Sequence, residues 1–144
     1  MTKTEEALNY FKDGFSCSQA VLCSFAKDFG LEEAHALKLS GSFGGGVARM
    51  NSMCGAVSGA LMVIGLKYGK TDAANDEQKE LNYKNAQQFA TEFKLKNKSV
   101  MCTDLLGVDL SNPEAGAYMK KNNLSEIVCR KAIRDAIEVL EQIL

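Results

Sequence analysis

The chain is poor in the features that most often carry enzyme chemistry. It has 144 residues, with a single histidine, a single proline and no Cys-x-x-Cys pair. No cluster of histidines and carboxylates competes with the cysteines for a reactive role. The run Gly41-x-x-Gly44-Gly45-Gly46 lacks the GxGxxG order and follows a predicted helix, so we do not expect nucleotide binding. Any reactive chemistry is therefore expected at sulfur.

Strong charge and long apolar runs are also missing. The 17 basic and 18 acidic residues nearly cancel, which argues against nucleic acid or an anionic membrane as a partner. The longest apolar run, Cys54 to Leu66, is shorter than the roughly 18 residues needed to span a bilayer. The first ten residues lack the pattern of a signal peptide. We therefore expect a cytoplasmic protein, where stable structural disulfides are rare.

Nearly every segment has helical periodicity, and none alternates long enough to predict a strand. Capping boxes begin the predicted helices Thr2–Lys12 and Ser16–Phe29. Further helices are expected at 32–39, at 54–67, at 76–96, around Cys102, after Pro113 and from a Ser125 cap to the C-terminus. The length suits one domain over residues 1–144. The predicted fold is an all-α, compact bundle of about six or seven helices.

Glycine is placed where helices would otherwise be expected to continue. Four glycines between Gly41 and Gly46 predict a turn or a close approach of two backbones. The helix 54–67 is apolar almost all round, which is typical of the centre of a bundle. Gly55 and Gly59 share one of its faces, so a neighbouring helix such as the one bearing Cys17 could pack closely there.

Three of the five cysteines lie at or near predicted helix starts. Cys17 follows the cap Ser16, while Cys54 and Cys102 each follow candidate capping residues. Free N–H groups and the helix dipole stabilise a thiolate at such positions. Arg49 is close enough in sequence to add a cation beside Cys54. These positions favour the reactive, anionic form of the thiol.

The other two cysteines have different surroundings. Cys129 lies on the apolar stripe of the last helix, which by itself indicates a small hydrophobic residue in a core. Cys23 lies about 240° around its helix from Cys17, at the ideal turn of about 100° per residue. We therefore treat Cys23 as a bystander.

Two runs carry a resemblance to a known family. Phe43–Met50 (FGGGVARM) and Cys54–Gly69 (CGAVSGALMVIGLKYG) resemble the signature of the C-GCAxxG-C-C family of redox-active proteins. The segments around Cys17 and Cys102 resemble its first and third cysteine segments, and Cys129 resembles its fourth cysteine. The resemblance extends from about residue 11 to the C-terminus and leaves Cys23 without a counterpart. It implies a redox-active or cluster-binding role and no particular substrate.

Three functions stay open at this point. In the first, Cys54 or Cys17 attacks an oxidised partner of unknown identity, and a second cysteine resolves the mixed disulfide, as in a thiol–disulfide oxidoreductase without a cofactor. In the second, Cys17, Cys54, Cys102 and Cys129 ligate zinc or an iron–sulfur cluster for electron transfer or sensing. In the third, the cysteines are buried in a structural or binding module. The glycine-rich turn and the apolar motif helix would also suit a homodimer.

Overall fold

A computed structural model describes residues 1–144 as eight right-handed α-helices, seven of them with seven or more residues, and no β-strand. The expected all-α architecture is therefore confirmed. In chain order the elements are α1 (Lys3–Lys12), α2 (Cys17–Ala26), a 3₁₀ turn (Lys27–Phe29), α3 (Glu33–Ser40), the left-handed segment α4 (Gly44–Arg49), α5 (Gly55–Tyr68), α6 (Asp76–Asn97), α7 (Cys102–Leu106), α8 (Ala115–Lys121), a π-helical turn (Ser125–Cys129) and α9 (Arg130–Ile143).

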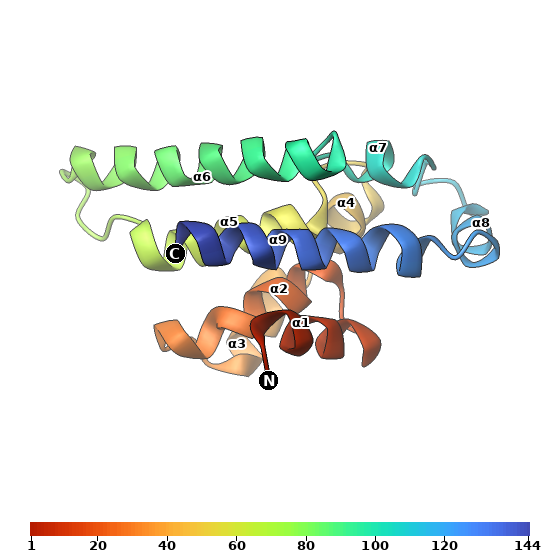
Figure 1. Cartoon of the computed structure of the whole chain (residues 1–144), viewed down its shortest axis with the longest axis horizontal. Coiled ribbons are helices and arrows are strands. Elements are labelled where there is room, and N and C mark those ends of the chain that lie inside the picture. Colours follow the sequence, from red (N-terminus) through yellow and green to blue (C-terminus); the bar gives the residue numbers. More distant parts are fainter.

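The helices form three layers (Figure 1). Helix α6 lies on one side, α5 and α9 occupy the middle, and α1, α2 and α3 lie on the other side. Segments α4, α7 and α8 gather toward one end of the molecule. No helix is long and apolar enough to cross a membrane.

The predicted capping boxes are present. At α1, Glu5 N–H donates to Thr2 Oγ1 while Thr2 N–H donates to the Glu5 carboxylate. At α2, Ser16 and Gln19 make the same reciprocal pair. Each box satisfies two N–H groups that a helix start leaves unpaired, so both starts are determined locally.

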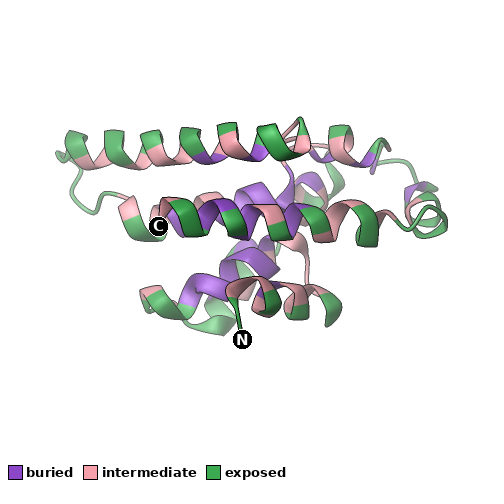
Figure 2. Ribbon diagram, in the orientation of Figure 1, coloured by how far each residue is buried: buried purple, intermediate pink, exposed green.

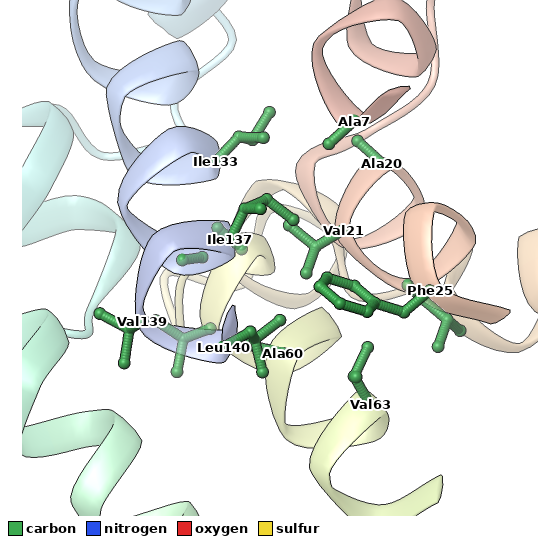
Figure 3. Packing of buried hydrophobic residues seen from close by; sticks show 14 of the residues in the cluster. Ala7, Ala20, Val21, Phe25, Ala60, Val63, Ile133, Ile137, Val139 and Leu140 are labelled. Atoms are coloured by element: carbon green, nitrogen blue, oxygen red, sulfur yellow. The ribbon is translucent and has the colours of Figure 1, made fainter. Parts of the chain in front are cut away.

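The main core lies where α2, α5 and α9 meet. Figure 2 shows burial concentrated on α2 and α5 and on the inner side of α9. In Figure 3, Val21 and Phe25 of α2 point toward Ala60 of α5 and Ile137 of α9, and all four are buried. The expectation that the motif helix is central is met, because residues 55–60 of α5 are all buried.

The small-residue face of α5 packs against α2, as its glycine spacing predicted. A Cβ atom added at Gly59 would lie 2.7 Å from the backbone oxygen of Ser18. One added at Gly55 would lie 3.1 Å from Ser18 N and 3.3 Å from the Cβ atom of Cys17. Only glycine at these positions lets the two helices approach this closely, and the approach brings Cys17 beside the start of α5.

The glycine-rich run turns left-handed. Gly45, Gly46, Val47 and Ala48 have φ angles of 66°, 65°, 61° and 52°, and Arg49 follows at 65°. A left-handed conformation costs a non-glycine residue about 1–2 kcal/mol, so this turn must be held by its surroundings. The expected turn is present, but three of its left-handed residues carry side chains.

The predicted Ser125 cap is wrong. The preceding residue, Leu124, already has helical φ and ψ angles of −69° and −32°, and Ser125 makes no capping hydrogen bond. The helix begins earlier than expected, at Leu124, so Ser125 lies inside the first turn and cannot act as its cap. The segment from Ser125 to Cys129 forms a π-helical turn that continues into α9.

Candidate functional site: a cavity lined by four thiols

Four cysteines line one cavity of about 210 Å³, which we call the thiol cavity. They come from four separate elements: the first residue of α2, the residue before α5, the first residue of α7 and the end of the π-helical turn. In that order they are Cys17, Cys54, Cys102 and Cys129. Most of the remaining wall is apolar and includes Phe11, Leu105, Leu106, Leu110, Met119 and Val128. The fold therefore brings together all four cysteines that the sequence singled out.

Glycines let these segments meet. A Cβ atom added at Gly46 would lie 2.8 Å from the Cβ atom of Cys102, and one added at Gly44 would overlap Ser16, the residue before Cys17. Gly55 contacts Cys17 in the same way from α5. The glycines of both runs thus have one effect: they leave out side chains that would keep the cysteine-bearing segments apart.

A short backbone pairing places Cys54 beside Cys102. Cys54 N–H donates to Val100 O at 2.7 Å, and Cys102 N–H donates to Ser52 O at 2.9 Å. These bonds flank an isolated antiparallel bridge between the residues that precede the two cysteines, Met53 and Met101. The starts of α5 and α7 are therefore held side by side by main-chain hydrogen bonds.

Cys17 and Cys129 form a second pair through their side chains. The Cys129 thiol has the largest effect on Cys17 and raises its pKa well above its usual value, with burial adding to the rise. The Cys17 thiol in turn lowers the pKa of Cys129, against the opposing effect of burial. Of the four thiols in the cavity, only that of Cys129 has a pKa below its usual value.

The thiols at the starts of α5 and α7 are held protonated. Burial raises the pKa of Cys54 to about 11, although the N–H groups of Ala56 and Val57 pull it back. Burial, followed by the charges of Cys54 and Cys129, raises the pKa of Cys102 to about 12. The helix-start argument placed the N–H groups correctly at Cys54, but removal of the thiols from water has the larger effect.

Arg49 does not serve Cys54 as the sequence suggested. Its side chain lines the thiol cavity, yet it is not among the groups that shift the pKa of any of the four thiols. Cys23 lies apart, as expected: it is 6% exposed in the main core and does not line the cavity. Burial, and then Glu33, raise its pKa to about 11.

The donor set suits a metal, but the geometry does not. Four thiols around one cavity are the ligands that zinc and iron–sulfur clusters prefer. No group of three or more His, Cys, Asp or Glu side chains, however, is arranged so that it could hold a metal ion. The four thiols as placed therefore do not form a metal site.

Sequence reasoning missed two features of this site. It ranked Cys54 and Cys17 as the likeliest reactive thiols and left the pairing open, whereas the thiol with the largest effect on the pKa of Cys17 is that of Cys129. It also missed the apolar wall that α7 and α8 contribute. A weak signal for the wall was present in Leu105, Leu106 and Met119, but nothing local says that they face the cysteines.

The comparisons with known proteins identify the family of the chain. No curated protein and no solved structure matches the chain. A family model described as "Putative redox-active protein (C_GCAxxG_C_C)" matches residues 15–143, a range that includes all four cysteines of the thiol cavity. The resemblance seen in the two glycine-containing runs is thereby confirmed, and the chain belongs to the C_GCAxxG_C_C family of redox-active proteins.

Proposed function

We propose that this protein exchanges electrons through reversible dithiol–disulfide chemistry, with Cys129 and Cys17 as the reacting pair. The observation that carries the proposal is that both thiols line the thiol cavity and that each has the largest effect on the pKa of the other. Both residues are partly exposed, whereas Cys54 and Cys102 are 5% and 8% exposed. The pair is thus less buried than Cys54 and Cys102 and includes the one thiol whose pKa is lowered.

The reaction balances as two thiol–disulfide exchanges. The Cys129 thiolate attacks one sulfur of a disulfide R–S–S–R, which forms a mixed disulfide and releases one RS⁻ that takes up a proton. The Cys17 thiol then loses its proton and attacks the Cys129 sulfur, which closes the Cys17–Cys129 disulfide and releases the second RS⁻. Two protein thiols are oxidised and one disulfide is reduced to two thiols, and the reverse reaction reduces the protein.

Cys54 and Cys102 have a supporting role in this proposal. A pKa of about 11 leaves Cys54 almost no thiolate near neutral pH, so it is a weaker first nucleophile than Cys129. Protonated, the two thiols add no negative charge to the cavity, which would otherwise oppose ionisation of Cys129. The sequence-based preference for Cys54 as an attacking thiol thus gives way to Cys129.

The test is a trapping experiment on the full chain. Fully reduced protein is mixed with limiting bis(2-hydroxyethyl) disulfide, quenched with iodoacetamide and mapped by peptide mass spectrometry. We expect a Cys17–Cys129 disulfide as the first product. Cys17→Ala should stop at a mixed disulfide on Cys129 and react more slowly at neutral pH, because the thiol that lowers the pKa of Cys129 is lost.

Cys23→Ala is the matched control, since it removes a cysteine that lies outside the cavity, and it should react like the parent protein. A first disulfide between Cys54 and Cys102, or no intramolecular disulfide at all, would refute the assignment. Metal analysis and an anaerobic absorption spectrum separate the metal alternative. Stoichiometric zinc, or cluster absorption that disappears in Cys-to-Ala variants, would replace the dithiol proposal.

A further inference from the structure

Arg49 is the one charged residue in the wall of the thiol cavity. Of the wall residues, only Arg49 and Ser125 are exposed, so both lie at the rim. The Arg49 guanidinium makes no ion pair and no hydrogen bond within the chain. A cation without an internal partner beside an apolar cavity is free to bind a group that enters with a ligand.

The backbone holds Arg49 at this rim against its own preference. Arg49 has a φ of 65° and ends a run of left-handed residues. The side chain of Asn51 anchors the turn from the other side. Its Nδ2 donates to Asp109 Oδ1 at 2.7 Å, and its Oδ1 accepts from Leu110 N–H at 2.9 Å. Strained backbone that is held in place by its surroundings is characteristic of binding and catalytic sites.

Arg49 does not tune the thiols themselves, since none of their pKa values responds to its charge. Its charge is therefore available to a substrate, and a guanidinium presents paired N–H donors that match a carboxylate. The cavity behind it, at about 210 Å³, is smaller than the roughly 300–1,000 Å³ of pockets for drug-sized ligands, and its wall is mostly apolar. This combination suits a short aliphatic arm that carries sulfur at one end and an anion at the other.

We propose that the thiol cavity selects low-molecular-mass disulfides that bear a carboxylate, and that Arg49 is the residue that binds this carboxylate. The proposal rests on the dithiol function above and adds its substrate class. With the carboxylate at Arg49, the disulfide lies over the thiols. The Cys129 thiolate attacks one sulfur of the disulfide and forms a mixed disulfide, while the other carboxylate-bearing thiolate leaves and is protonated. The Cys17 thiol then loses its proton and attacks the Cys129 sulfur, which closes the protein disulfide and releases the second carboxylate-bearing thiol.

The test compares three disulfides of similar size and different charge: 3,3′-dithiodipropionate, bis(2-hydroxyethyl) disulfide and cystamine. Rates of oxidation of the reduced protein are divided by the rate of each disulfide with a free thiol in solution. In the parent protein we expect the anionic disulfide to react fastest. Arg49→Gln should slow that reaction alone, by about tenfold, the size expected for loss of one charged hydrogen-bonded contact. Arg49→Lys should keep part of the preference.

Arg134→Gln is the matched control, because Arg134 is an exposed arginine without an ion pair that lies outside the cavity wall. A second readout needs no redox step. Suberate, which has the chain length of dithiodipropionate without its sulfurs, should protect Cys129 from iodoacetamide in the parent protein and not in Arg49→Gln. The uncharged 1,8-octanediol should protect neither.

The outcomes distinguish the two proposals. If the Cys17–Cys129 disulfide forms at normalised rates that ignore substrate charge, and suberate gives no protection, the substrate class is refuted and the dithiol function stands. If Arg49→Gln slows all three disulfides equally, Arg49 acts on the thiols or the fold, and the substrate class is again refuted. If none of the three small-molecule disulfides produces the Cys17–Cys129 bond, the dithiol function fails. Protection of Cys129 by suberate would still support the carboxylate site in that case.

Discussion

The close approach of α2 and α5 can be tested with two identical substitutions in one helix. Gly59 and Gly65 both lie within α5, so Gly→Ala changes helix propensity alike at both, in favour of the helix by about 1 kcal/mol. Their surroundings differ. Around Gly65 no heavy atom lies within 4 Å of the added Cβ atom, so Gly65→Ala should stabilise the fold by about that amount.

At Gly59 the same Cβ atom would lie 2.7 Å from the Ser18 oxygen, and 3.2 Å from both the Ser18 Cα atom and the Val21 Cβ atom. Two of these atoms are backbone, so α2 must move as a unit. Overpacking of this kind costs about 1–3 kcal/mol, and a contact with backbone belongs at the upper end. After the gain in helix propensity, Gly59→Ala should lose about 2 kcal/mol.

The assay is urea unfolding of the reduced proteins, followed by circular dichroism and analysed by linear extrapolation. The free energies of unfolding of the two variants should differ by about 3 kcal/mol, with Gly65→Ala above the parent and Gly59→Ala below it. Movement of α2 would also carry Cys17 away from Cys129, so Gly59→Ala should slow formation of their disulfide and Gly65→Ala should not. Equal stability of the two variants would refute the packing argument.

Two further predictions concern the left-handed turn and the buried thiols. Ala48→Gly should raise the free energy of unfolding by about 1 kcal/mol, because glycine adopts the φ of 52° without strain. The same substitution in a right-handed helix, Ala86→Gly within α6, should lower the free energy of unfolding by about 1 kcal/mol. A loss of stability in both variants would contradict the left-handed turn. Burial raises the pKa of Cys54 from 9.0 to about 11, so the folded protein favours the protonated thiol. Its contribution to the free energy of unfolding is therefore complete below pH 9 and is lost as the pH rises through 11. Unfolding measured from pH 8 to pH 11 should therefore show a shallower decline for Cys54→Ala than for the parent, and equal slopes would contradict the burial of this thiol.

Most of the helices could be predicted because their signals are local. The capping boxes at Thr2 and Ser16 act within a few residues, and both are present. The prediction for Ser125 failed because a capping residue has non-helical backbone angles, whereas the helix already begins at Leu124. The left-handed turn of α4 could not be predicted past its glycines, since Val47, Ala48 and Arg49 disfavour that conformation and are held in it by contacts.

The four cysteines show the same division at the site. The family motifs identified Cys17, Cys54, Cys102 and Cys129 as one set, and the glycines indicated close packing beside two of them. Their ionisation could not be predicted, because the helix-start effect on a thiol is local, whereas the burial that overrides it depends on the apolar wall supplied by α7, α8 and the π-helical turn.

The sequence by itself thus determined an all-α chain, the positions of most helix starts, the glycine face of α5 and the set of four cysteines, since each depends on the order of neighbouring residues. Only the tertiary structure decided that Cys17 and Cys129 line one cavity with Cys54 and Cys102, that the pKa of Cys129 is lowered, and that Arg49 lines the same cavity without a partner. The physical reason is that the approach of thiols distant in sequence, their removal from water and the position of a charge beside a cavity all depend on how separate segments pack, and no single segment contains that information.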